Sequence, residues 1–197
     1  MGLLFLVLSY ILGSIPFSIV IAKIFFNKDI RKEGSGNPGT TNVIRTCNVY
    51  AGIAVFLLDI LKAGVPVLIA RKLNITLFGF DNELIYGAAA IFGHTCSIFL
   101  NFKGGKGAAS ALGAVFFYNP LWGLIGFTLA IIIFIITRFV SLCSLIVAAS
   151  MILIAIIFQD YSSLVSVIPV VILIFIKHKT NIIRLINHNE NKLKFKK

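Results

Sequence analysis

The densest group of side chains that could bind an anion lies between Gly34 and Thr46, in the sequence Gly-Ser-Gly-Asn-Pro-Gly-Thr-Thr-Asn-Val-Ile-Arg-Thr. Glycines let backbone N–H groups come close to a ligand, and successive N–H groups in such a turn form an anion-binding concavity. Arg45 adds a fork of donors that matches phosphate. The segment is therefore predicted to hold a phosphate group.

Two further segments carry donors of the same kind. Residues 101–107 read Asn-Phe-Lys-Gly-Gly-Lys-Gly, which is a second glycine-rich basic turn. His178 and Asn181 are three residues apart and would share one face of a continuous helix. If these segments meet in the fold, they predict a site for more than one phosphate.

Several familiar motifs are excluded by their context or spacing. Residues 34–39 spell G-x-G-x-x-G, but a dinucleotide site needs a preceding strand, and here an apolar, helix-length segment precedes. Residues 100–107 depart from a Walker A loop, because Leu100 and Gly107 stand where Gly and Ser or Thr are required. No histidine is followed by a carboxylate at His-x4-Asp spacing, and no G-x-S-x-G elbow is present. The sequence thus shows no evident resident base.

The composition is that of a membrane protein. Of the 197 residues, 58% are hydrophobic and 13% are charged, whereas soluble domains carry about 25% charged residues. The length predicts a single domain, residues 1–197. The net charge of +11 comes from residues between and after the apolar segments, which is typical of the positive-inside rule and not of nucleic-acid binding. Three isolated cysteines predict neither a disulfide framework nor a metal site.

Seven apolar segments are predicted to be helices. The fourth has only eleven residues before Asn119-Pro120, which is about 16 Å of helix and roughly half of the hydrocarbon thickness. The predicted segments are about 2–24, 49–70, 84–100, 108–118, 121–137, 139–158 and 162–176.

The positions of lysine and arginine predict the orientation. The N-terminal end carries none, whereas the first polar loop and the tail are basic, so the N-terminus should lie outside and the C-terminus in the cytoplasm. This requires an odd number of crossings, which favours seven transmembrane helices, one of them short, over six. The basic residues of the tail are Lys177, Lys179, Arg184, Lys192, Lys194, Lys196 and Lys197.

Ionisable residues also occur within the predicted spans. Asp59 and Lys62 are three residues apart and can pair on one helix face. A structural ion pair is the simpler interpretation, because ionisable groups inside a span usually face each other or a cavity. For His94, a packing role and a role in the site are equally open.

This topology brings four polar segments to the cytoplasmic face. They are Gly34–Thr46, Asn101–Gly107, Arg138–Ser144 and Lys177–Arg184. Irregular glycine-rich backbone at membrane depth is tolerated where it lines a cavity. The four segments are therefore expected to form one site.

The residues at these positions resemble the motifs of one family. They are the run from Gly34 to Arg45, Gly93-His-x-x-Ser with Phe102-Lys-Gly-Gly-Lys-Gly, and Arg138-Phe-Val-Ser-Leu with His178-x-x-Asn-Ile-x-Arg-Leu. They resemble the bacterial acyl-phosphate:glycerol-3-phosphate acyltransferases, in order and over nearly the whole chain. Asp59-Ile-Leu-Lys62 also resembles a family pattern, with Ala63 where a glycine is usual.

The resemblance implies an all-α polytopic enzyme of the bacterial inner membrane, with its active site facing the cytoplasm. Such an enzyme transfers a fatty acyl group from acyl phosphate to position 1 of glycerol 3-phosphate, giving lysophosphatidic acid and phosphate. Its partners are these two substrates and membrane lipid, with no cofactor, no metal, no nucleic acid, and neither acyl-CoA nor an acylated carrier protein as donor. The departing phosphate is hypothesised to accept the hydroxyl proton.

The family's roles, carried over by motif, imply the site residues. Ser35, Arg45, Lys106, His178 and Asn181 would be the catalytic residues that bind glycerol 3-phosphate or acyl phosphate, and Ser141 would line the same site. The residues that would cradle phosphate are Gly36, Asn37, Gly39, Thr40, Thr41, Asn42, Gly104, Gly105 and Gly107.

The main alternative is a transporter for phosphorylated small solutes. Such proteins commonly have inverted repeats and binding sites near the midplane. Here the polar loops are predicted at one face and no repeat is visible, which favours the transferase. Acyl-chain length preference and oligomeric state are left open by the sequence.

Overall fold

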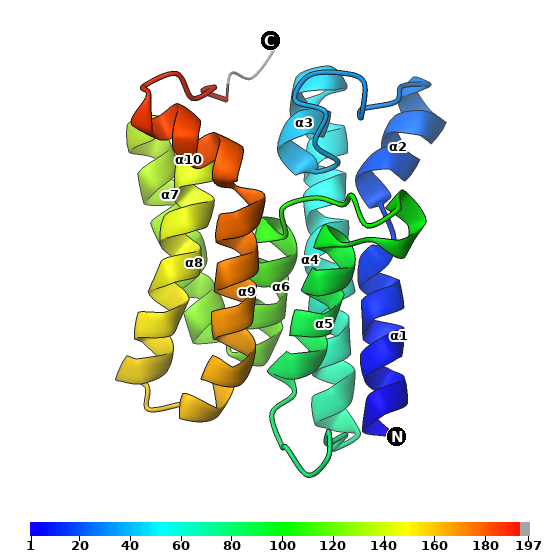
Figure 1. Cartoon of the computed structure of the whole chain (residues 1–197), viewed down its shortest axis with the longest axis vertical. Coiled ribbons are helices and arrows are strands. Elements are labelled where there is room, and N and C mark those ends of the chain that lie inside the picture. The colour runs from blue at the N-terminus through cyan, green and yellow to red at the C-terminus, as the bar shows by residue number, and fades with distance from the viewer. Residues whose placement is uncertain (194–197) are drawn as a thin grey trace.

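The computed structural model describes residues 1–193, and regular structure in this range is entirely helical (Figure 1). Lys194, Lys196 and Lys197, which contributed to the predicted orientation, lie outside the described residues. The helices are α1 (Gly2–Ser14), α2 (Phe17–Phe26), α3 (Thr40–Thr46), α4 (Val49–Lys72), α5 (Leu84–Thr95), α6 (Ala108–Tyr118), α7 (Pro120–Thr137), α8 (Val140–Ile157), α9 (Leu164–Lys177) and α10 (Lys179–Ile186), with 3-10 turns at Ile98–Leu100 and Tyr161–Ser163.

Each of the seven predicted apolar segments, all within the described residues, is helical over most of its length, the first as two helices, but fewer than seven are long enough to count as candidate membrane spans. Four stretches are long and apolar enough to cross a membrane, namely Gly2–Phe26, Val49–Lys72, Pro120–Thr137 and Val140–Ile157. A fifth candidate is the bent pair of α9 and α10, whose axes differ by 62°. The apolar helices around α5 and α6 are shorter.

The first span is broken between α1 and α2, which the sequence analysis did not predict. Pro16 lacks an N–H group and Ile15 has an extended ψ of 119°, as expected for a residue before proline. At the break the carbonyl of Ile15 accepts from the N–H of Phe17 at 3.1 Å in place of the usual donor four residues on, and the Nζ of Lys62 on α4 also donates to it at 3.0 Å. A buried side chain thus supplements the backbone hydrogen bond at the break.

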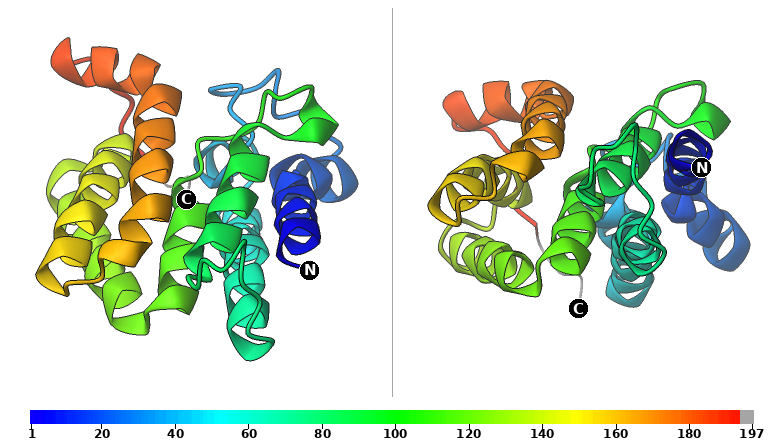
Figure 2. Two further views of the ribbon diagram at one scale, coloured as in Figure 1. Left: turned by 60° about the horizontal axis from the view of Figure 1, so that its bottom comes forward. Right: turned by 90° about the horizontal axis from the view of Figure 1, so that it is seen from below.

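Residues 108–118 form a separate helix, as predicted. The side chain of Asn119 caps α7 by accepting from the N–H of Leu121 at 3.0 Å, and Pro120 occupies the first turn, where no donor is needed. Helix α6 packs against α4, α5 and α7 (Figure 2). A Cβ on Gly113 would lie 2.2 Å from the carbonyl oxygen of Ile60, so glycine permits the close approach of α6 to α4.

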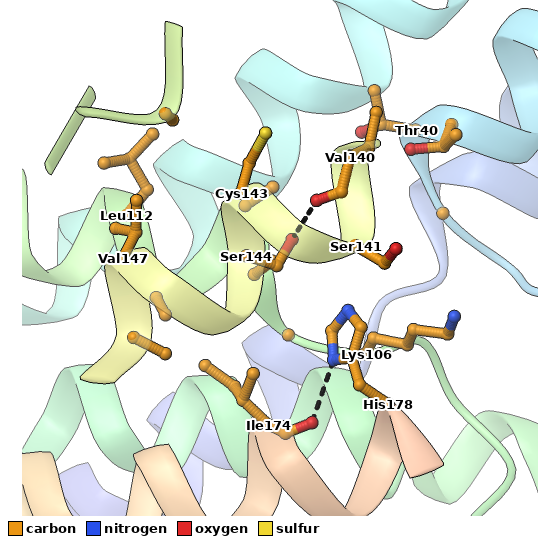
Figure 3. A pocket seen from close by; sticks show the side chains of 18 of the residues that line it. Thr40, Lys106, Leu112, Val140, Ser141, Cys143, Ser144, Val147, Ile174 and His178 are labelled. Atoms are coloured by element: carbon orange, nitrogen blue, oxygen red, sulfur yellow. Dashed lines mark hydrogen bonds between the residues drawn. The ribbon is translucent and has the colours of Figure 1, made fainter. Parts of the chain in front are cut away.

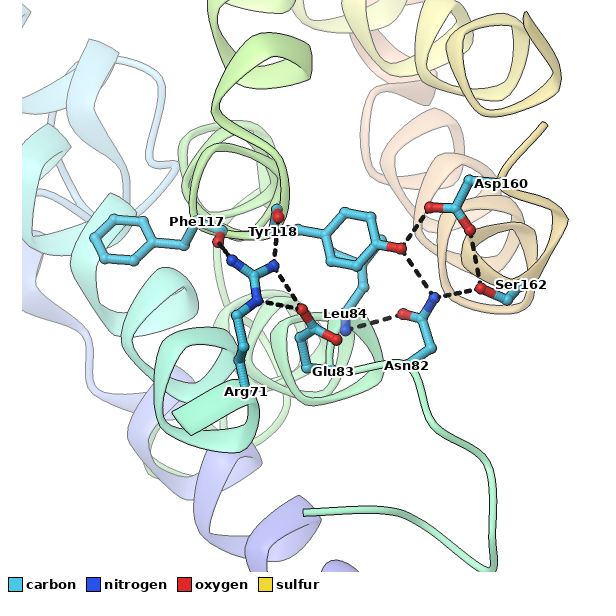
Figure 4. A network of polar contacts seen from close by, with 8 residues as sticks. All are labelled: Arg71, Asn82, Glu83, Leu84, Phe117, Tyr118, Asp160 and Ser162. Atoms are coloured by element: carbon cyan, nitrogen blue, oxygen red, sulfur yellow. Dashed lines mark hydrogen bonds and ion pairs between the residues drawn. The ribbon is translucent and has the colours of Figure 1, made fainter. Parts of the chain in front are cut away.

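The end of the bundle opposite to α3 and α10 is tied together by a polar network (Figure 4). Tyr118 at the end of α6 donates to Asp160, and Asn82 donates to the Tyr118 hydroxyl at 3.1 Å and to Ser162 Oγ at 2.7 Å. Arg71 at the end of α4 pairs with Glu83, with Nε 2.6 Å from Oε1. We call these six residues the far-end network: Arg71, Asn82, Glu83, Tyr118, Asp160 and Ser162.

Candidate active site

A cavity of about 350 Å³ opens at the end of the bundle that carries α3 and α10. All four predicted polar segments contribute to its wall, so the fold brings them together (Figure 1). The predicted site residues that line it are Ser35, Asn37, Gly39, Thr40, Thr41, Asn42, Arg45, Lys106, Gly107, Ser141, His178 and Asn181. Gly36, Gly104 and Gly105 do not line it.

The buried Asn42 side chain shapes the first loop. Its Oδ1 accepts from the Ser35 N–H at 2.8 Å, and its Nδ2 donates to the carbonyls of Ile30 at 2.8 Å and Glu33 at 3.1 Å. Gly34 has φ +60°, and a Cβ there would lie 2.3 Å from Asn42 Oδ1. The Asn42 amide is therefore used to fold the loop, and the expectation that Asn42, which lines the cavity, is part of a phosphate cradle stays a prediction.

The N–H groups of four glycines in the two loops are used within the fold. The N–H of Gly104 donates to the carbonyl of Thr95 at 3.2 Å, and that of Gly105 donates to His94 at 3.0 Å. In the first loop, the N–H of Gly36 donates to Glu33 and that of Gly39 to Asn37, both at 3.0 Å. These four glycines give the loops their shape, and a phosphate cradle formed by the rest of the loop backbone, including Gly107 in the cavity wall, stays a prediction.

Lys106 is the cation of the second loop that reaches the cavity. Its Nζ donates to Asn181 Oδ1 on α10, and burial lowers the pKa of the ammonium from 10.5 to about 8. Lys103, in the same loop, is exposed. Thr40 lines the cavity, and its Oγ1 is buried with no hydrogen-bond partner among residues 1–193.

His178 is buried at the junction of α9 and α10 and faces the same space as Lys106 and Ser141 (Figure 3). Its Nδ1 is 2.8 Å from the carbonyl oxygen of Ile174. Since a carbonyl only accepts, Nδ1 carries the hydrogen. Burial lowers the pKa of the imidazole to about 4, so the ring is neutral near pH 7 and Nε2 can accept a hydrogen bond.

Glu190 is a site residue that the sequence analysis missed. Its Oε1 accepts from Ser141 Oγ at 3.0 Å and from Asn181 Nδ2 at 2.7 Å, and its Oε2 lies 3.2 Å from Arg184 Nε. Next to it, the guanidinium of Arg45 donates to the carbonyl of Asn191 at 3.1 Å. Glu190 is the only acidic residue in 177–197, which was the available signal. This carboxylate fixes the cations and amides that surround the cavity.

A buried cluster of three ionisable side chains supports the second loop. Asp59 Oδ1 is 2.7 Å from Lys62 Nζ and 3.5 Å from His94 Nδ1. This confirms the predicted ion pair. The imidazole lies directly against Gly105, where a Cβ would be 2.2 Å from His94 Nε2. His94 therefore packs under the loop that carries Lys106.

The cavity continues away from the polar end into the bundle as an apolar arm. We define the arm by six of the buried apolar residues that line it on α5, α6, α8 and α9, namely Leu84, Ile91, Ala114, Val115, Met151 and Val167. Cationic and amide side chains thus line one end of the cavity, and mostly apolar side chains line the arm that extends from it. Among residues 1–193, no group of three or more His, Cys, Asp or Glu side chains could hold a metal ion.

A family model described as glycerol-3-phosphate acyltransferase matches residues 3–188. The chain belongs to the glycerol-3-phosphate acyltransferase family. A glycerol-3-phosphate acyltransferase of Fusobacterium nucleatum is 40% identical over 97% of this chain and 97% of its own length. Glycerol-3-phosphate acyltransferase 2 of Lactobacillus acidophilus is 44% identical over 96% of this chain and 89% of its own length.

Two solved structures share the fold. The glycerol 3-phosphate form of PlsY, an integral membrane glycerol 3-phosphate acyltransferase, superposes with a TM-score of 0.90 at 39% identity, covering 98% of this chain and 96% of PlsY. The lysophosphatidic acid form gives 0.86 at 39% identity, covering 97% and 94%. The protein is therefore an all-helical integral membrane acyltransferase, and nothing in these comparisons supports the transporter alternative.

Proposed function

We propose that the protein transfers a fatty acyl group from acyl phosphate to position 1 of glycerol 3-phosphate, which would be the first step of phospholipid synthesis. The observation that carries this proposal is the continuity of the cavity. Its polar end holds Arg45, Lys106 and Arg184, and its apolar arm runs into the bundle. A donor with a phosphate next to a fatty acyl chain matches both parts. Glycerol 3-phosphate supplies a second anion for the same cations.

The reaction needs no resident base. The hydroxyl oxygen of glycerol 3-phosphate attacks the carbonyl carbon of the acyl phosphate, the bond from that carbon to the bridging oxygen breaks, and phosphate leaves with the bonding electrons. The hydroxyl proton passes to the departing phosphate, so the products are lysophosphatidic acid and inorganic phosphate. Because the mixed anhydride is already activated, the protein supplies positioning and stabilisation of the developing charge.

The site residues divide between these two tasks. Lys106 and Arg45 place positive charge at the polar end, where the phosphates would lie. The Nε2 of His178 would accept a hydrogen bond from the attacking hydroxyl and so orient it. Ser35 lines the wall formed by the first loop, and Thr40 would donate through its unpartnered hydroxyl.

The orientation in the membrane is part of the proposal. Seven helical segments, with α6 as the short one, would place the N-terminus outside the cell and the cavity at the cytoplasmic face of the bacterial inner membrane. In support, α3 and α10 lie at the same end of the bundle, away from the N-terminus (Figure 1). The chain would act as one domain, because a single cavity draws its wall from α3 to α10.

The donor is tested by supplying purified, lipid-reconstituted protein with glycerol 3-phosphate and either palmitoyl phosphate or palmitoyl-CoA. Lysophosphatidic acid is expected from palmitoyl phosphate alone, in equal amount to the phosphate released. Product from palmitoyl-CoA alone would overturn the proposed donor. The Lys106→Ala variant in the same lipid serves as the control for contaminating activity.

The alkaline limb of the pH profile is expected to come from Lys106. Its pKa of about 8 in the free protein means that the ammonium charge is present below this pH and is lost as the pH rises through it. Since kcat/KM reports the groups of the free enzyme, kcat/KM should fall about tenfold per pH unit above that value. Arginine stays charged throughout, so an alkaline limb that persists unchanged in Lys106→Arg would assign it to another group.

A further inference from the structure

The apolar arm ends inside the protein. Its deepest lining residues are Leu84 on α5, Met151 on α8 and Val167 on α9, which are only 3%, 6% and 5% exposed. We call these three residues the closed end. By contrast, Phe127 on α7, which also lines the cavity, is 40% exposed.

Two helices give the same depth for the closed end. Met151 follows Ser141 by ten residues on α8, and Leu84 precedes His94 by ten residues on α5. At ~1.5 Å per residue, each interval spans about 15 Å. The closed end therefore lies about 15 Å below the polar groups, at a depth that the tail of a fatty acyl chain would reach.

The far-end network lies directly behind the closed end. The Oδ1 of Asn82 accepts from the N–H of Leu84 at 3.0 Å. The ring of Tyr118 packs edge-on against Trp122, with centroids 5.8 Å apart, and Trp122 belongs to the same buried cluster as Met151 and Val167. The hydrogen bonds of Tyr118 to Asp160 and Asn82 (Figure 4) thus hold Tyr118 and Asn82 in position behind the closed end.

We propose that Leu84, Met151 and Val167 limit the length of the acyl chain that the protein accepts, and that the far-end network holds this limit in place. The proposal rests on the proposed function, because it assigns the apolar arm to the acyl group. Close-packed interiors do not yield freely to extra methylenes, so a chain longer than the arm must leave its last carbons outside or distort the wall.

The test compares kcat/KM for a series of saturated acyl phosphates from dodecanoyl to eicosanoyl. Val167→Phe should lower the ratio of hexadecanoyl to dodecanoyl turnover by at least about tenfold, since single groups in an apolar pocket discriminate by 10-fold or more. Met151→Ala should shift the preference toward longer chains. The opposite directions of these two shifts separate a length limit from general damage to the fold.

Leu153 provides the matched control. It lies two residues after Met151 on α8 and is 62% exposed, so Leu153→Phe and Leu153→Ala should keep the wild-type length profile. Tyr118→Phe keeps the ring but removes the hydroxyl between Asn82 and Asp160, and it should broaden the profile toward longer chains. Wild-type profiles in both Met151→Ala and Val167→Phe would overturn the proposal and would place the chain along another part of the cavity wall, such as the exposed Phe127.

A binding measurement separates this proposal from the proposed function. Ligands that bind the folded state raise its thermal midpoint according to their affinity, and lysophosphatidic acids of increasing chain length can be used without any turnover. If the wild-type protein consumes no acyl phosphate, the proposed function fails. Even then, the closed end would be supported if the chain length that gives the largest rise in thermal midpoint becomes longer in Met151→Ala and shorter in Val167→Phe. If that chain length is the same in both variants as in the wild type, the closed end is refuted.

Discussion

Replacing Lys106 with alanine is expected to lower kcat/KM by about 10²–10³-fold, the usual effect of removing one donor that stabilises developing negative charge. Lys106 is the cation of the second loop whose Nζ reaches α10, through its bond to Asn181. The burial that lowers its pKa also means that water does not screen its charge from a bound phosphate. The measurement is steady-state turnover with palmitoyl phosphate at several concentrations of glycerol 3-phosphate.

Lys103→Ala is the control for this prediction. Lys103 lies in the same glycine-rich loop but is exposed, so its removal should leave kcat/KM within about threefold of wild type. Lys106→Arg should retain more activity than Lys106→Ala because it keeps the charge. Near-normal turnover in Lys106→Ala would show that Lys106 does not stabilise the transition state, and it would contradict the proposed placement of charge.

Replacing Asp59 with leucine is expected to destabilise the protein by about 3–5 kcal/mol, which is typical when one partner of a buried ion pair is removed. Both Asp59 and Lys62 are buried, so the variant would leave the Lys62 ammonium without a carboxylate and with the Ile15 carbonyl, 3.0 Å away, and the Phe17 ring as its neighbours. The thermal midpoint of the protein in a fixed detergent should fall accordingly.

The double variant Asp59→Leu/Lys62→Met removes both charges and should recover most of the lost stability. Lys72→Met, at the exposed end of the same helix, should change the midpoint little. If Asp59→Leu is as stable as wild type, the pair does not hold opposite charges. A double variant that is stable but has a reduced kcat would show that the cluster also positions the loop above His94.

The helical segments could be read from the sequence because the bilayer makes hydrophobicity decisive. Each apolar run is helical over most of its length, although the first is broken into α1 and α2 and α5 ends at Thr95, and Asn119-Pro120 separates α6 from α7 as expected. The break at Pro16 was missed because its stabilising donor, Lys62, is 46 residues away in the sequence. A local pattern cannot show that a distant buried lysine supplies a hydrogen bond at the break.

Which residues line the cavity was predictable from the motifs, but which of their groups face a ligand and which only hold the loops in shape was not. Arg45, Lys106, Ser141, His178 and Asn181 all line the cavity, as the motifs indicated. However, glycine patterns do not reveal whether their N–H groups face a ligand or the chain's own carbonyls, and in both loops several face carbonyls.

Glu190 shows a related difficulty. A single carboxylate in a basic tail looked like ordinary surface charge, whereas the fold buries it among Ser141, Asn181 and Arg184. Its role depends on how the tail folds back over α8 and α10, which charge counting along the sequence cannot show. The closed end and the far-end network depend in the same way on contacts between distant helices.

The most direct test of the central claim follows the bridging oxygen of the donor. Palmitoyl phosphate labelled with ¹⁸O at the bridging position is incubated with the purified protein and glycerol 3-phosphate, and both products are analysed by mass spectrometry. Attack at the acyl carbon predicts that all of the label leaves with inorganic phosphate, with one lysophosphatidic acid formed per phosphate. Label retained in a fatty acid, or no lysophosphatidic acid from folded protein, would contradict the account.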